Sequence, residues 1–254
     1  MLNSQASETW LDSLFKWADD NRIPCYYFPR DKEIKYRRVF NLSHLHLTSF
    51  PANFKRLQNI KNLDLGFNNF QIFPFDIICQ LINIKTLKIA LSSLTSLPSE
   101  FATLQNLECL DLAFNKIGNS PISIICQLTN LKSLDLGSCD LTALPDDFVN
   151  LSKLDDLKLD FNNFTSIPSP IFHLEKLKRL NLKGCNLTSL PNELTNLSNL
   201  QELDLLFNNF QQFPEIIFEL ENLKEIGIAH NLVTAEIKNR LNDKDMCLMY
   251  KEQL

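Results

Sequence analysis

Proline returns along this chain with a fixed period. Successive members of the series are 23 or 24 residues apart. A period of this length indicates supersecondary units that stack on one another, because one such unit cannot bury its own apolar face. The 254 residues would also suffice for two ordinary domains, but the period favours one elongated domain. The series consists of Pro51, Pro74, Pro98, Pro121, Pro145, Pro168, Pro191 and Pro214.

Each unit follows the pattern LxxLxLxxNxLxxLPxxIxxLxxL, as in LKRLNLKGCNLTSLPNELTNLSNL at 177–200. The alternation in LxLx is typical of a strand with one buried side, and the proline that follows forces a turn. Stacked units share one core, in which a fully buried large side chain contributes about 1.5–3 kcal/mol.

This pattern resembles the leucine-rich repeat, in particular the cytosolic LPxxIxxL class with units of about 23 residues. The resemblance covers residues 37–233, as nine units of which the last is incomplete. It implies an α/β fold: a right-handed leucine-rich repeat solenoid, curved like part of a horseshoe, with a parallel sheet on its concave wall. Ligands of this family usually bind that wall.

A longer period of 46 or 47 residues is superimposed on the first. Phe67, Phe114, Phe161 and Phe207 recur with it, each before an asparagine. Two hypotheses stay open for these rings: packing along the edge of the solenoid, or an aromatic stripe that faces a ligand. In the family's asparagine column the amide can satisfy unpaired backbone groups. The column holds Asn68, Asn115, Asn162, Asn208 and Asn231, with Ser92, Cys139 and Cys185 in the units between.

Both ends carry segments suited to cap the core. Residues 1–36 are predicted to form an N-terminal cap, a helix followed by an extended segment, and residues 234–254 a C-terminal helical cap. A membrane or partner anchor is the alternative for the first helix, but its mixed, mildly acidic polar face disfavours anionic lipid. Its apolar residues at helical spacing are Trp10, Leu11, Leu14, Phe15, Trp17 and Ala18.

The composition argues against several classes of ligand. A formal net charge of -5 argues against general binding of nucleic acid or anionic membranes. Five glycines and no phosphate-binding motif argue against a nucleotide, so no cofactor is expected. Seven cysteines without CxxC spacing suggest reduced thiols rather than disulfides or a zinc site. The start MLNSQASETW lacks the features of a signal peptide, so a cytoplasmic location is expected.

The outward-facing strand positions give the candidate partner-binding site. They combine an acidic patch with neighbouring cations, which could orient a charged partner. Ordinary solvated strand faces are the alternative. A lane of small residues from Gly66 to Gly137 could also admit partner side chains. The candidate residues are Glu108, Asp111, Asp135, Asp156, Lys158, Asp160, Arg179, Lys183, Phe114 and Phe161.

We therefore expect a monomeric, non-catalytic module that binds a protein. The cap and the low-glycine repeats resemble those of bacterial proteins, which suggests an effector delivered into a host cell without a conventional signal peptide. A resident cytosolic scaffold is an alternative, and an enzyme with a grafted site is another. Effectors that join such repeats to a ubiquitin ligase carry a large extra domain, which we do not expect here. His44 and His46 lie far from His173, so no metal site is expected.

Overall fold

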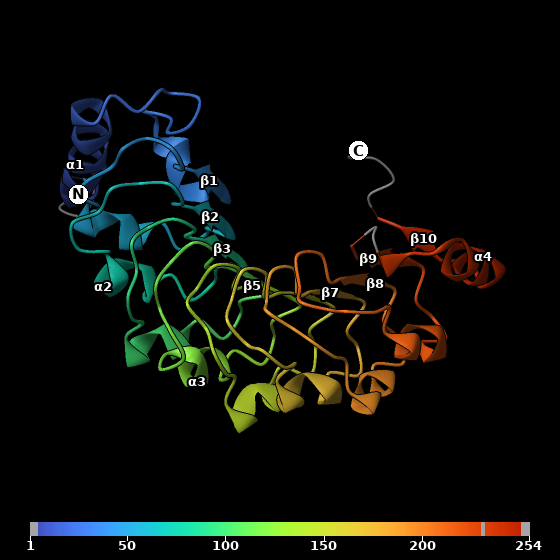
Figure 1. The fold of residues 1–254 in the computed structure, drawn as a ribbon. Coiled ribbons are helices and arrows are strands. Elements are labelled where there is room, and N and C mark those ends of the chain that lie inside the picture. Colours follow the sequence, from blue (N-terminus) through green and yellow to red (C-terminus); the bar gives the residue numbers. More distant parts are fainter. Residues whose placement is uncertain (1–4, 230–231, 250–254) are drawn as a thin grey trace.

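In the computed structural model, which describes residues 5–229 and 232–249, the strands form one continuous parallel sheet. The ten strands lie side by side in chain order, on the concave wall of a curved solenoid (Figure 1). The fold is thus the predicted α/β repeat solenoid. The strands are β1 Val39–Asn41, β2 Asn62–Asp64, β3 Thr86–Lys88, β4 Cys109–Asp111, β5 Ser133–Asp135, β6 Asp156–Lys158, β7 Arg179–Asn181, β8 Glu202–Asp204, β9 Glu225–Gly227 and β10 Cys247–Leu248.

The apolar alternation places one side of every strand in the core. Leu87 pairs with Leu63 and with Leu110 in the neighbouring strands, and all three side chains are almost fully buried. Because every unit repeats this register, although the units have 23 or 24 residues, the residues at one position of the pattern form a column across the sheet. Each column of outward-facing side chains therefore contains residues from many units.

Eight short helical turns of the described residues form the outer wall, and each begins directly after a proline of the periodic series. Proline suits this place because it lacks the N–H that a first helical turn would leave unpaired. Figure 1 shows the turns on the side away from the sheet. They are η2 Ala52–Arg56, α2 Phe75–Ile78, η3 Ser99–Thr103, α3 Ile122–Ile125, η4 Asp146–Asn150, η5 Ser169–His173, η6 Asn192–Asn196 and η7 Glu215–Glu219.

The asparagine column joins each phenylalanine-bearing unit to the unit before it. Asn162 donates from Nδ2 to the carbonyl of Leu136 at 2.8 Å, and its Oδ1 accepts the N–H groups of Cys139 and Leu141. Asn68, Asn115 and Asn208 repeat this arrangement. The amides satisfy backbone groups where the chain leaves the strand, as predicted. Asn231 lies outside the described residues.

The N-terminal helix α1, Gln5–Asp20, lies against the first repeat. Leu14 and Ala18 are fully buried, and the Trp17 ring meets Phe28 and Phe50 edge to face at 5.7 and 5.6 Å between centroids. A further turn, η1 Lys32–Tyr36, leads into β1. The helix thus covers the end of the core.

At the other end, α4 Ala235–Asp243 is followed by a strand that the sequence did not predict. β10 pairs in parallel with β9, so the chain returns to the sheet after the helix. The predicted boundaries at 36 and 233 stay predictions. Within the described residues, none of the helices has the length and apolar character that crossing a membrane would require.

Candidate partner-binding surface

The predicted site residues lie on the concave wall and at its edge, from β4 to the turn after β7. The register pairs Asp135 with Asp111 on one side and with Lys158 on the other, and it pairs Asp156 with Arg179. Glu108 directly precedes β4. The remaining candidates follow the ends of their strands: Phe114 after β4, Asp160 and Phe161 after β6, and Lys183 after β7.

Two of the predicted aspartates have a structural task that the sequence reading did not assign. Asp111 Oδ1 accepts the N–H of Ala113 at 3.0 Å, and Asp135 Oδ1 accepts that of Gly137 at 3.1 Å. Asn181 makes the same bond to Lys183, and Lys158 occupies the equivalent position of β6, so the bond requires an oxygen acceptor but no charge and is not made in every unit. The acidity of Asp111 and Asp135 is therefore not explained by this bond.

The acidic patch and the cations beside it form ladders across the strands. Lys158 Nζ lies 3.1 Å from Asp135 Oδ2, and Arg179 lies 3.2 Å from Asp156. All of these groups are partly exposed, so each pair contributes little to stability. Their arrangement instead determines the charge pattern that a partner meets.

Negative charge remains concentrated around Asp135. Burial and then the neighbouring Asp135 raise the pKa of Asp111, and the same two causes raise the pKa of Asp160. Asp160 also accepts a hydrogen bond from Asn181 at 3.1 Å. Asp135 forms an ion pair with Lys158, and the charge of Lys183 opposes the rise in the pKa of Asp160. A cation brought by a partner would reduce the repulsion among them.

The lane of small residues does not provide the room that the sequence suggested. Gly66, Ala90, Ala113 and Gly137 are all buried. A Cβ atom at Gly137 would lie 2.9 Å from a carboxylate oxygen of Asp160. A neighbouring side chain already fills the space at this glycine, so the lane does not admit a partner there.

The recurring phenylalanines form an exposed row along the edge of the concave wall. Phe114, Phe161 and Phe207 remain 54, 50 and 69% exposed. Phe67 is less exposed because it stacks on His44, with ring centroids 4.1 Å apart. Phe161 lies against Gly184, and the ammonium of Lys183 lies 5.7 Å from its centroid and 4.9 Å from that of Phe207. The rings thus pack on the edge and also face solvent.

The backbone of this row is left-handed in every unit from His44 to Phe207, with φ between 47° and 64°. From His44 to Gly184 each residue of the row donates its N–H to the next unit, as Phe114 does to the carbonyl of Gly137 at 2.8 Å, and the chain then leaves the sheet. A bulky residue in this conformation is strained by about 1 kcal/mol. The sequence reading missed this strain, although Gly184 in the same column was a signal for it.

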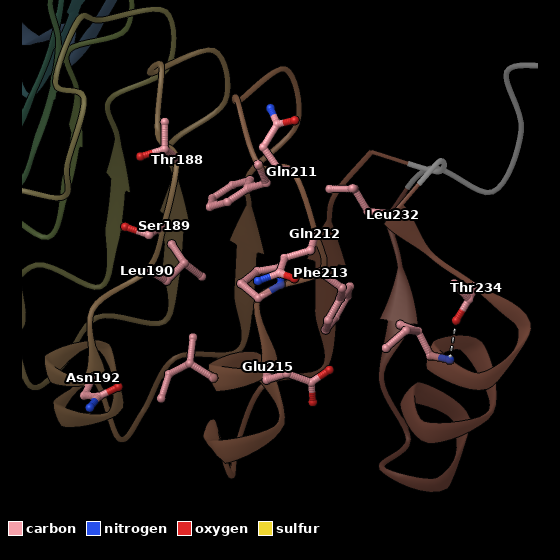
Figure 2. Close-up of a pocket in the computed structure, with 14 residues that line it drawn as sticks. Thr188, Ser189, Leu190, Asn192, Gln211, Gln212, Phe213, Glu215, Leu232 and Thr234 are labelled. Carbon is pink, nitrogen blue, oxygen red and sulfur yellow. Dashed lines mark hydrogen bonds between the residues drawn. The ribbon is translucent and has the colours of Figure 1, made fainter.

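Two hollows are relevant to ligand binding. One of about 180 Å³ lies on the concave wall between β6 and β8, and its lining includes Asp156, Lys158 and Arg179. The other, of about 680 Å³, lies beside the C-terminal cap, where Leu190 and Phe213 stand among polar side chains (Figure 2). Thr234 at its rim accepts the N–H of Ile237 and so caps α4.

Residues 5–229 and 232–249 contain no group of three or more histidine, cysteine, aspartate or glutamate side chains placed to hold a metal ion. Burial raises the pKa of the Cys139 thiol to about 12 and that of Cys185 to about 11. Each thiol donates to a backbone carbonyl at 3.2 Å, Cys139 to that of Leu112 and Cys185 to that of Leu159. These two cysteines serve the packing of the units that lack the asparagine.

Comparisons with known proteins identify the same repeats. A family model described as a leucine-rich repeat region matches residues 110–247. No curated protein matches the chain. A solved leucine-rich repeat protein of Leptospira interrogans is similar, with 28% identity and a TM-score of 0.63 over 83% of this chain and 65% of that one.

Two internalins of Listeria monocytogenes have similar structures. InlF shows 23% identity and a TM-score of 0.68, over 85% of this chain and 62% of that one. Internalin C2 shows 22% identity and a TM-score of 0.64, over 75% and 80%. At this identity the likeness concerns the fold alone. The chain spans less than two thirds of the Leptospira protein and of InlF.

Proposed function

The chain belongs to the leucine-rich repeat proteins, and from this premise we propose that it binds a partner protein through its concave wall without catalysing a reaction. Such repeats commonly serve as protein-interaction modules. The binding surface would extend from β4 to the turn after β7 and include the charge ladders and the row of phenylalanines.

One observation carries the proposal. Phe114, Phe161 and Phe207 keep half or more of their surface exposed while their backbones hold a strained left-handed conformation. An aromatic ring that stabilises the core would compensate for the strain, but an exposed ring does so only in part. Rings of this kind gain their full burial when a partner covers them, and aromatic residues often dominate binding energies at interfaces.

The charges on the concave wall favour a partner with a complementary charge pattern. Asp111, Asp135 and Asp160 make one part of it acidic, while Lys183 follows along the edge. Such a bipolar pattern aligns two proteins during their encounter and raises the association rate. The surface fits a macromolecule better than a small molecule, because most of it is an open sheet.

The test is affinity capture with a variant that changes charge without disturbing the strands. Asp111→Asn and Asp135→Asn keep the oxygen acceptor that Asn181 provides at the equivalent position, and Asp156→Asn keeps the size of the side chain beside Arg179. The matched control is Asp146→Asn, Glu193→Gln and Glu219→Gln, which makes the same charge change on the outer wall. We expect a partner, identified by mass spectrometry, that the native chain and the control retain and the concave variant loses. Equal capture by all three chains would contradict the concave site.

We also propose that the partner is a host protein and the chain a bacterial effector. The likeness to solved bacterial repeat proteins supports a bacterial origin. Capture from eukaryotic and from bacterial lysates separates this proposal from a resident cytosolic scaffold. A specific partner found in the bacterial lysate alone would contradict the effector role and leave the binding function in place.

A further inference from the structure

The row of exposed rings has a spacing that restricts which peptide backbone can follow it. Phe114, Phe161 and Phe207 lie in alternate units, so two strand separations divide each ring from the next. Parallel strands lie about 4.7–4.9 Å apart, which places the backbone positions of successive phenylalanines in the row about 9.4–9.8 Å from one another. The position of Lys183 agrees, because its ammonium lies within 6 Å of both the Phe161 and the Phe207 centroids.

A polyproline II segment matches this spacing. It rises about 3.1 Å per residue with three residues per turn, so every third side chain points the same way at intervals of about 9.3 Å. Over the two intervals from Phe114 to Phe207 the mismatch is below about 1 Å. Proline rings at these positions could each lie on one phenylalanine, which is how aromatic surfaces recognise proline-rich segments.

The other regular conformations fit less well. A helix repeats its face after seven residues, at about 10.5 Å, and would be displaced by about 2 Å over two intervals. A strand presents the same face after two or four residues, at about 6.6 or 13 Å, and neither interval equals that of the rings. The periodic rings therefore favour the polyproline conformation.

Charge defines the second property of the ligand. Asp111 and Asp160 lie in the units that carry Phe114 and Phe161, and Asp135 lies in the unit between them. Within the described part of the chain, Asp135 has an ion pair, with Lys158, whereas no cation pairs with Asp111. A basic side chain beside the prolines would add to the positive charge that Lys88 and Lys158 bring to Asp111.

We propose that the row of Phe114, Phe161 and Phe207 binds a proline-rich segment of the partner, with proline at every third position and a basic residue beside it. This inference rests on the proposed function. The segment runs across the strands, along the edge of the concave wall. The two units between those of the rings contribute Ser138, with a small side chain, and Gly184, over which the Phe161 ring lies.

The experiment measures fluorescence anisotropy of labelled peptides with the full chain. The probe has about twelve residues, with proline at every third position and arginine at one end. One comparison peptide has the same composition with proline at every second position, and another is a helical peptide with leucine at every seventh. We expect the probe to bind at least about tenfold more tightly than either, and replacing its arginine by glutamine to weaken it.

Variants of the chain test the row itself. Phe161→Ala removes the central ring, and Ser138→Leu places a large side chain between two rings, where the same column already holds Leu91 with φ of 47°. Both should weaken the probe at least about tenfold. Ile72→Ala, which trims an apolar side chain that is 87% exposed outside the row, should leave binding unchanged. Circular dichroism and the urea midpoint verify that each variant is folded.

Tighter binding of the helical peptide, or undiminished binding by Phe161→Ala, would overturn the inference. Failure of the probe together with capture of a protein that needs the concave aspartates would also overturn it, while the proposed function would stand. If the concave variant captured the partner as well as the native chain does, that result would count against the proposed function, whatever the peptides do.

Discussion

Oδ1 of Asn115 accepts the backbone N–H of Ser92 at 3.0 Å and thereby joins two successive repeats. The same oxygen accepts the N–H of Leu94, and Nδ2 donates to the carbonyls of Ile89 and Leu112 at 2.9 and 2.8 Å. One buried amide thus satisfies backbone groups on both sides of a unit boundary. Because the stability of a solenoid depends on the interfaces between neighbouring repeats, these bonds stabilise the whole stack and not only their own turn.

Replacing Asn115 by alanine should lower the free energy of unfolding by at least about 3 kcal/mol, because several buried backbone groups lose their partner at once. Urea denaturation followed by circular dichroism measures the loss. Asn150→Ala is the control, since this asparagine is exposed in η4, and it should change stability by less than about 0.5 kcal/mol. Similar effects of the two substitutions would show that the amide does not hold the units together.

The sequence predicted those features that depend on the repeat alone. The positions of Leu63 and Leu87 follow from the period, and so do the strand order and the role of the asparagines. The task of Asp135 was not predictable, because a carboxylate that accepts a backbone N–H looks the same in a sequence as one that awaits a partner. Nor was the strand β10, since two residues of pairing carry no periodic signal.

The cysteines should divide into two classes by their reactivity. Cys25 and Cys247 are exposed, whereas burial raises the pKa of Cys79 to about 11 and that of Cys126 to about 12. The thiolate is the reacting species, so buried thiols with a high pKa react slowly. Timed alkylation at pH 8 with peptide mass spectrometry should label Cys25 and Cys247 first, and the buried Cys79, Cys126, Cys139 and Cys185 fully only in denaturant. Early labelling of Cys126 would contradict the packing of α3.

Glu108 should show a pH dependence set by two lysines. Hydrogen bonds from Lys132 and then from Lys85 lower its pKa from the ordinary 4.5 to about 2, against a small opposing effect of burial. A lowered pKa in the folded state means that the pairs stabilise the fold above about pH 4.5 and that this contribution is lost as the pH falls through about 2.

The difference in Tm between the native chain and Glu108→Gln should therefore be largest near neutral pH and disappear towards pH 2. Titration of the Glu108 carboxyl by NMR measures the same coupling directly. In a Lys85→Met, Lys132→Met variant the midpoint should move up towards 4.5, and about 1 M salt should move it the same way, because salt screens exposed pairs. A midpoint near 4.5 in the native chain would mean that Glu108 does not pair with Lys85 and Lys132 in solution.

The left-handed backbone at Phe114, with φ of 58°, should reverse the usual order of glycine and alanine. Both substitutions remove the exposed ring, but only alanine keeps a Cβ that is strained at positive φ. Phe114→Gly should therefore be more stable than Phe114→Ala by about 1 kcal/mol in urea denaturation. Ile72 has no positive φ, so the same pair of substitutions there should favour alanine or show no difference. Greater stability of the alanine variant at Phe114 would mean that the column is not left-handed in solution, and the strain that supports a binding role for the row would then be absent.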